Sequence, residues 1–234
     1  MGIMLARFVG VVLRGMFAAI LLLRRPRPIH ARGLILTGEL TWLANSPPAG
    51  VAWIDDRPDR PVPVVARLSR SVGLPGWLPD VIGLAMRVQV DAGPEGGRRP
   101  VDLELASTGG GVPSRFMLIP HRRPSAARLT TLLPYRGMRG PVLIGARTRS
   151  PRSLPGGRAA IADALRRDPW RLRLFHARPT GAWQAFADLE LGSAVDREGE
   201  QERFDRVRNP LPGAGTYDWV RAVHQPSYRL TQGG

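Results

Sequence analysis

The sequence contains no cysteine at any of its 234 positions. Disulfide bonds, thiolate nucleophiles, zinc knuckles and iron–sulfur clusters are therefore excluded. The sequence does not indicate the redox compartment of the protein, because it has no cysteine that could be a free thiol or form a disulfide. Lysine is also absent, so all 34 basic residues are arginine. Histidine is limited to four residues, and aromatic side chains make up only 6% of the chain.

The formal net charge of +15 raises the question of nucleic-acid binding. The arginines are scattered along the chain, and the aromatic content is too low for a base-stacking surface. An arginine bias beside abundant Ala, Gly and Pro is what a high-GC genome produces without selection for DNA contacts. We therefore expect no nucleic-acid partner. An anionic membrane surface or an anionic cofactor suits this charge better.

The 27 glycines and 23 prolines leave little room for long helices. Segments typical of strands recur at short spacing, and they are 33–42, 62–69, 80–90, 102–108, 115–119, 170–176 and 182–191. Residues 158–167 predict a short helix, whereas 120–157 are interpreted as an irregular crossing segment. The pattern predicts a mainly β (α+β) fold, an antiparallel β-barrel with few short helices.

Residues 5–25 predict a cationic amphipathic helix, because Arg7, Arg14 and Arg25 fall on one helical stripe. The uninterrupted apolar run of residues 16–23 is far shorter than the ~20 residues that span a bilayer. Such a helix lies in a membrane interface or packs on its own domain, and both alternatives stay open. No small-residue cleavage site follows, which argues against a cleaved signal, and a signal anchor is a third alternative.

The chain is accordingly divided into an N-terminal amphipathic helix, residues 1–26, and a barrel domain, residues 27–234. We expect a cytoplasmic protein that is peripheral on the inner face of the plasma membrane if the helix meets lipid. The oligomeric state stays open.

Several motifs resemble the catalase superfamily in the same order along the chain. Pro28-Ile29-His30-Ala31-Arg32-Gly33 precedes one predicted strand, and Ala66-Arg67-Leu68-Ser69-Arg70 ends the next. The first resembles the Val-Val-His-Ala-Lys-Gly segment at the start of the haem-enclosing barrel of catalases. Asp80–Val88, Asp102-Leu103 and Phe204-Asp205 resemble later pieces of that barrel. The sequence thus resembles a short, degenerate catalase-like protein, and the resemblance implies a catalase-like barrel.

The resemblance also implies roles for five residues. His30 would be the distal histidine and would move a proton on bound peroxide as a general acid–base. Arg27 and Arg67 would pair with haem propionates, with Ser69 beside them and Phe116 flanking the macrocycle. We expect His30 and Arg67 to converge inside the closed sheet and to face the same cavity. The alternative is that His30 satisfies a backbone carbonyl while the arginines stay solvated.

Two departures from the catalase pattern bear on activity. Alanine, serine and threonine occupy positions 106–108, where catalases carry the distal asparagine. Catalases bind iron through a tyrosinate held by an arginine four residues earlier, and none of Tyr135, Tyr217 and Tyr228 has arginine at that spacing. Without that ligand, ferric iron loses electron donation. We therefore expect a haem-binding protein with weak peroxidase-type activity or none, and no true catalase activity; its metal ligand is unknown.

Two other functions stay open. A non-enzymatic barrel could bind another planar or apolar small molecule where haem would sit. A phosphodiester hydrolase is the third alternative, although the four histidines show no metal-binding spacing. The glycine run 109–111 is interpreted as a hairpin turn rather than a phosphate cradle.

Overall fold

The computed structural model describes residues 33–91, 97–151, 153–194 and 204–218. All but the last three of these belong to one compact unit, residues 31–215. The N-terminal helix expected for residues 1–26 lies outside the described residues, as do Arg27 and His30.

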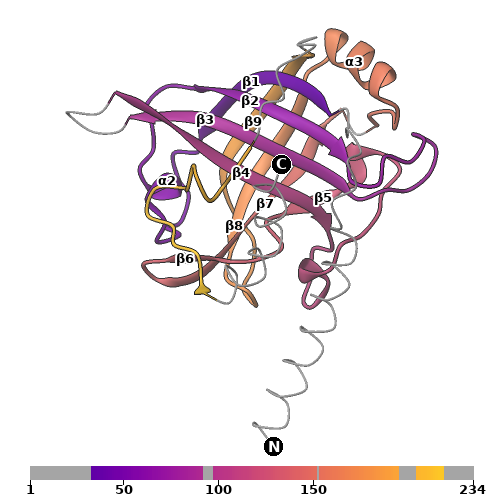
Figure 1. Ribbon diagram of the computed structural model, residues 1–234. Helices are drawn as coiled ribbons and strands as arrows, with labels where there is room; N and C mark the ends of the chain where they lie inside the picture. The colour runs from indigo at the N-terminus through magenta and orange to yellow at the C-terminus, as the bar shows by residue number, and fades with distance from the viewer. Residues whose placement is uncertain (1–32, 92–96, 152, 195–203, 219–234) are drawn as a thin grey trace, which may run out of the picture. The chain divides into compact units, whose positions relative to one another are not determined.

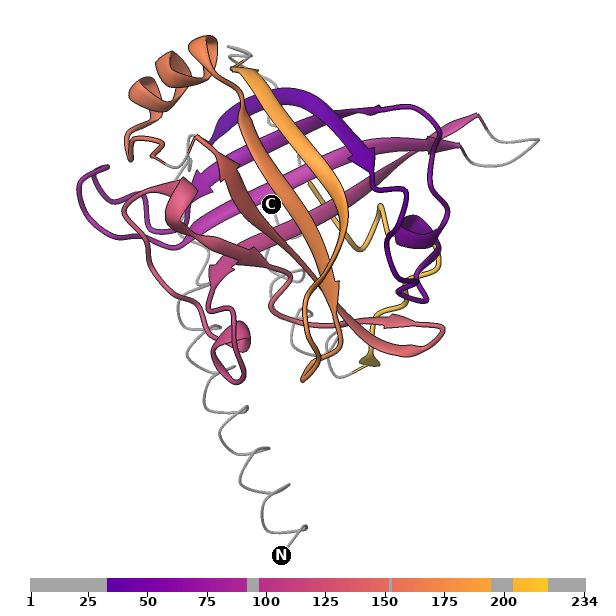
Figure 2. The ribbon, with the colours of Figure 1, turned by 180° about the vertical axis from the view of Figure 1, so that it is seen from behind.

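Eight antiparallel strands form a closed barrel (Figure 1). They are β1 (Leu34–Trp42), β2 (Val62–Arg70), β3 (Ile82–Asp91), β4 (Arg98–Thr108), β5 (Arg128–Thr130), β7 (Gly140–Ser150), β8 (Trp170–Ala177) and β9 (Gln184–Ala194). The sheet closes because β9 pairs with β1 and β5 pairs with β7. Figure 2 shows the closing strands β1 and β9 side by side. A short strand, β6 (Tyr135–Gly137), pairs with β7 outside this circle. The mainly β antiparallel barrel predicted from the sequence is confirmed.

Helices in the described part of the chain are few and short, as the sequence predicts. They are α2 (Ala52–Asp55), α3 (Arg158–Arg167) and the 3-10 turns η1 (Ser114–Phe116) and η2 (Pro124–Ala126). Helix α3 has the predicted bounds, and it buries Ile161 and Leu165. None of the described helices has the length and apolarity needed to cross a bilayer.

The inside of the barrel is filled with apolar side chains. On β2, for example, Val64, Ala66 and Leu68 are buried in the core, with exposed fractions of 0–5%. Equivalent positions on the other strands carry the largest fully buried side chains, among them Leu36, Leu40, Leu84, Met86, Leu103, Leu129, Ile144 and Trp170. Because successive side chains of a strand point to opposite faces, Arg67 and Ser69 lie on the outer face. The expectation that Arg67 faces a cavity inside the closed sheet is therefore wrong, since apolar side chains fill that space.

Two sequence predictions are wrong. Residues 115–119 were expected to form a strand, but Ser114–Phe116 form η1, and Leu118 makes only an isolated bridge to Thr108. The segment 120–157, expected to be irregular, contains the long strand β7. β7 alternates less clearly than the other strands, because five consecutive residues, 142–146, are all buried. An added Cβ on Gly145 would lie 3.0 Å from the Leu129 carbonyl oxygen and 3.1 Å from the Trp183 ring, so the fit there is tight.

Candidate functional site

Three of the five residues predicted from the resemblance lie in the described part of the chain. Arg67 and Ser69 lie two positions apart on the outer face of β2. Phe116 ends η1 in the connection between β4 and β5 and is half-buried. The barrel therefore brings Arg67 and Ser69 onto one surface, while His30 and Arg27 are not described.

Small side chains surround Ser69 on this outer face. Ser69 lies opposite Gly83 on β3, and Gly83 lies opposite Ala106 on β4. Arg67 lies opposite Ala85 in the adjacent row. The Ser69 hydroxyl donates a 3.4 Å hydrogen bond to the Gly83 carbonyl. An added Cβ on Gly83 would come within 2.7 Å of the Ser69 hydroxyl oxygen. The result is a strip without large side chains next to the Arg67 guanidinium.

The Arg67 side chain packs over an aromatic ring. Its Cζ atom lies 5.8 Å from the centroid of the Phe204 ring, and the Arg87 Cζ atom lies 5.2 Å from the same centroid. Both distances fall within the range of cation–π interactions. The Nε atom of Arg67 is buried and has no hydrogen-bond partner among the residues that the structure describes. A buried guanidinium N–H without an acceptor is unfavourable, so this edge of the strip is suited to a carboxylate.

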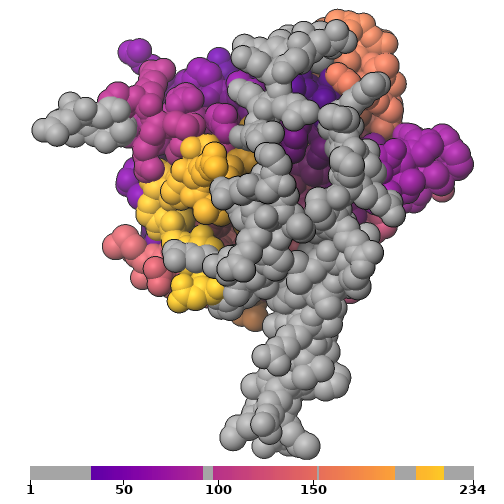
Figure 3. All heavy atoms as spheres, in the orientation of Figure 1, coloured from indigo at the N-terminus to yellow at the C-terminus, as the bar shows by residue number. Residues whose placement is uncertain are grey.

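Phe204 is held in place through a buried carboxylate. Arg87 donates two hydrogen bonds to Asp102, of 2.7 and 2.8 Å. The same carboxylate accepts hydrogen bonds from the Asp205 backbone at 2.7 Å and from the Asn209 side chain at 2.8 Å. Burial alone would raise the pKa of Asp102, but these hydrogen bonds hold it below its ordinary value. In the space-filling view, the section containing Phe204 lies against the barrel beside β3 and β4 (Figure 3).

Tyr135 lies near this cluster, on β6. Burial raises the pKa of Tyr135 to about 12, and a smaller opposing effect comes from Arg206. The phenol therefore stays protonated at neutral pH.

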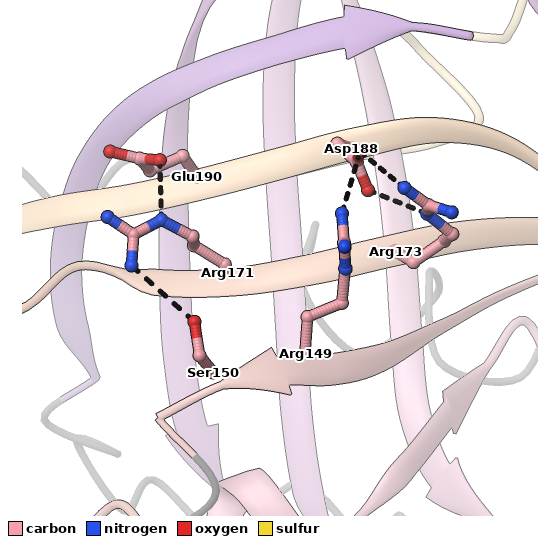
Figure 4. A network of polar contacts seen from close by, with 6 residues as sticks. All are labelled: Arg149, Ser150, Arg171, Arg173, Asp188 and Glu190. Carbon is pink, nitrogen blue, oxygen red and sulfur yellow. Dashed lines mark hydrogen bonds and ion pairs between the residues drawn. The ribbon is translucent and has the colours of Figure 1, made fainter.

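A second candidate site is a surface groove of about 620 Å³ over β1, β8 and β9. Arg173 binds Asp188 through two hydrogen bonds, of 2.8 and 2.7 Å, and Arg149 reaches the same carboxylate at 3.2 Å. Arg171 binds Glu190 at 3.0 Å (Figure 4). These opposite charges pair with one another across neighbouring strands. Arg67, Ser69 and Phe116, the described residues that the resemblance predicts, do not line this groove.

Two histidines are described, and they lie apart from both sites. The His176 ring is hydrogen-bonded through Nε2 to the Pro47 carbonyl at 2.9 Å, and burial lowers the pKa of the ring. Burial also lowers the pKa of His121. Within the described ranges, no three His, Asp or Glu side chains gather in a way that could hold a metal ion. The described residues therefore give the phosphodiester hydrolase alternative no metal site.

The sequence did not single out Arg87 and Asp102 as a pair. The spacing of charged residues could have predicted this pair. Arg87 lies opposite Asp102 in the same pair of strands in which Asp91 lies opposite Arg98. Opposite charges at matching distances from a glycine-rich turn indicate directly facing positions on two strands. Phe204 carries no comparable signal, because its position depends on tertiary packing.

No protein-family model matches the sequence, and no curated protein matches it. Solved structures do match. A fungal catalase aligns with a TM-score of 0.59 and 11% identity over 88% of this chain and 59% of the catalase. A bacterial catalase aligns with a TM-score of 0.51 and 12% identity over 86% of this chain and 55% of the catalase. The chain thus spans less than two thirds of these catalases, and at this low identity the similarity concerns the fold alone. This chain has a catalase-like fold.

Proposed function

We propose that this protein binds haem against the outer face of β2–β4 and has weak peroxidase-type activity or none. The proposal rests chiefly on Arg67, whose buried Nε lacks a hydrogen-bond partner in the described part of the chain and lies beside a strip of small side chains. A flat macrocycle with carboxylate arms needs such a combination, a surface without bulky groups and a cation at its edge.

In this proposal, Arg67 binds a propionate and Ser69 lines the macrocycle. Phe116 flanks it, Arg27 binds the second carboxylate, and His30 moves the proton of bound peroxide. Haem would supply a redox-active iron, whose protein ligand is not identified. Positions 106–108 carry no asparagine to hold peroxide, and none of the three tyrosines follows an arginine by four residues. True catalase turnover is therefore not part of the proposal.

Haem titration of the full-length protein tests this function. We expect a Soret band, and we expect Arg67→Ala to weaken haem binding about tenfold, since a hydrogen bond to a charged group is worth roughly 1.5–3 kcal/mol. Arg173→Ala is the matched control, because it removes an outer-face arginine of β8 far along the sheet order from β2. Absence of a Soret band in folded protein, or equal binding by both variants, would contradict the proposal. Peroxide-dependent oxidation of a small-molecule dye measures the peroxidase activity.

A second candidate is a non-enzymatic barrel that binds another planar or apolar molecule at the same surface. Glu104 favours it, because this carboxyl side chain lies opposite Ala85 in the same row as Arg67. A carboxylate there disfavours an anionic macrocycle more than a neutral ring. Tighter binding of an uncharged planar dye than of haem, lost in a Gly83→Leu variant, would select this candidate.

A membrane surface is a separate proposal, which rests on the sequence of residues 5–25. Co-sedimentation with anionic phospholipid vesicles, comparing the full chain with a version that starts at Arg27, tests it. Equal pelleting of the two proteins would refute a membrane role for this segment.

A further inference from the structure

Two arginines face each other across β5 and β7 on the outer surface of the barrel. Arg128 lies directly opposite Arg147, and both side chains are exposed. Like charges at facing positions repel each other. Within the described ranges neither guanidinium forms an ion pair, whereas Arg173, the next residue in this row, is paired with Asp188. The free protein therefore holds two adjacent cationic groups without an anion.

A cavity of about 120 Å³ opens beside these arginines. Its walls combine two aromatic rings, a glycine loop and the two guanidinium groups, and no acidic side chain. The lining residues are Gly109, Gly110, Arg128, Leu129, Thr130, Gly145, Ala146, Arg147, Phe175 and Trp183. The cavity thus offers an apolar part and a cationic edge, the usual composition of a small-molecule site.

The walls of this cavity are fixed by the structure around them. The Trp183 indole donates a 2.9 Å hydrogen bond to the Gly110 carbonyl, and the Arg115 Cζ atom lies 5.0 Å from the Trp183 ring centroid. Arg115 is itself buried and donates hydrogen bonds to the carbonyls of Arg178 at 3.1 Å and Gly181 at 2.9 Å. The indole and the glycine loop are therefore held before any ligand arrives.

Glycines leave room at two of these walls. An added Cβ on Gly110 would overlap the flexible end of the Arg128 side chain, and one on Gly145 would lie 3.0 Å from the Leu129 carbonyl oxygen and 3.1 Å from the Trp183 ring. The Arg128 side chain can move aside, and the neighbours of Gly145 would have to shift by only a few tenths of an ångström. Gly109 and Gly110, interpreted from the sequence as part of a simple turn, also line this cavity.

We propose that this cavity binds a small aromatic carboxylate. The ring would lie against Trp183 and Phe175, and the carboxylate would be shared by Arg128 and Arg147. A cavity of about 120 Å³ has room for a single six-membered ring but not for a fused polycyclic ligand. The two guanidinium groups disfavour a cationic ligand, and no acid stands among the described lining residues to offset them. This site is independent of the proposed haem surface, which uses different residues.

Calorimetric titration of the full-length protein with benzoate tests the proposal. Saturable binding with one site is expected, and Arg147→Gln should weaken it about tenfold, since a hydrogen bond to a charged group is lost. Arg149→Gln is the matched control, because it lies on the same strand but binds Asp188 outside the cavity. The control variant should bind benzoate as the original protein does. Equal weakening in both variants would overturn the proposal by showing only a general charge effect.

Two further ligands separate the aromatic and the anionic contributions. Benzylamine, which carries the same ring with the opposite charge, should not bind. Inorganic phosphate should compete only weakly, because it cannot use the aromatic walls. Phosphate binding as tight as that of benzoate, or no saturable benzoate binding by folded protein, would overturn the proposal. Since Arg147→Gln removes a repulsion, circular dichroism should show that the variant folds normally.

Discussion

Two arginine–aspartate pairs on the outer face of the barrel share their geometry but differ in burial. Arg87 binds Asp102 and Arg173 binds Asp188, each through two hydrogen bonds between neighbouring strands. The Asp102 side chain is fully buried, with 0% exposed, whereas Asp188 remains 33% exposed. Asp102 also accepts bonds from the section around Asp205, so four donors converge on one carboxylate.

We predict that Asp102→Asn lowers the free energy of unfolding by about 3 kcal/mol, because an amide cannot accept from four donors and leaves a buried guanidinium uncompensated. The matched change Asp188→Asn should cost less than about 1 kcal/mol, since its pair is open to solvent. Urea unfolding at pH 7 measures both values. Similar losses in the two variants would mean that burial does not distinguish the pairs.

His176 predicts a pH dependence of stability. Burial lowers the pKa of this ring, so the unfolded chain, with an ordinary value near 6.5, binds the proton more readily than the folded one. The stabilising contribution is therefore complete above pH 6.5 and is lost as the pH falls below 6.5 through the folded value. Nearby Asp55 opposes this effect and Arg178 adds to it, both less strongly than burial.

The expected result is a decrease in the free energy of unfolding between pH 7 and pH 5 that is smaller in His176→Gln. Glutamine can still donate a hydrogen bond to the Pro47 carbonyl, so the variant should fold. His121 shifts in the same direction, and a variant that lacks both histidines should show the flattest profile. Chemical unfolding at several pH values measures this, and an unchanged slope in His176→Gln would refute the assignment.

At the scale of the elements, the pairing of β1 with β9 closes the barrel, and Gly38 lies at its tightest point. An added Cβ on Gly38 would come within 1.8 Å of the Glu190 backbone carbonyl. The register of the two strands shifts between Leu36 and Gly38, so the strands already deviate from regular pairing here. Gly192 on β9 has open space at the equivalent position, with nothing within 4 Å.

We predict that Gly38→Ala destabilises the protein by about 3 kcal/mol, because the backbone of β9 must move away from β1. Gly192→Ala should change stability by less than about 0.5 kcal/mol, as expected for an uncrowded surface site. Thermal unfolding followed by circular dichroism compares the two. A harmless alanine at position 38 would show that the closing strands are not tightly paired in solution.

The sequence predicted β1–β4 because their apolar residues alternate clearly and turns rich in Gly and Pro separate them. It missed β7, because residues 142–146 are all buried and show no alternation that would mark a strand. It wrongly extended a strand through Arg115, whose side chain folds back to bind loop carbonyls. Local sequence patterns thus predicted the strands whose one face packs in the core. They failed where a contact with a distant segment determines the backbone conformation.

The candidate site shows the same division. The sequence predicts that Arg67 faces a cavity inside the closed sheet, and this prediction is wrong. Its strand neighbours Ala66 and Leu68 point into the core, so Arg67 lies on the outer face. Sequence alone could not place Phe204 under two guanidinium groups, because that contact joins segments far apart in the chain. Nor could it find the cavity at Trp183, since its walls come from three separate strands and two loops.

At the scale of the whole molecule, the order of the strands makes folding depend on one long-range event. Neighbours along the chain mostly pair as hairpins, but β1 must pair with β9, the last strand. An aromatic cluster forms where the barrel closes. The ring centroids of Trp42 on β1 and Trp53 are 5.5 Å apart, and those of Trp53 and Phe186 on β9 are 5.8 Å apart. The cluster can assemble only when the two ends of the sheet meet.

We predict that tryptophan fluorescence and far-ultraviolet circular dichroism follow one cooperative unfolding transition, because an open sheet would expose the apolar lumen along two edges. Refolding should take roughly milliseconds to seconds, as in other folds dominated by non-local pairing. Stopped-flow refolding monitored by both signals measures this, with Trp77→Phe as a control background that removes an exposed tryptophan outside the cluster. If strand formation were complete long before the fluorescence change, an open sheet would be a stable species, and closure between β1 and β9 would not be what holds the barrel together.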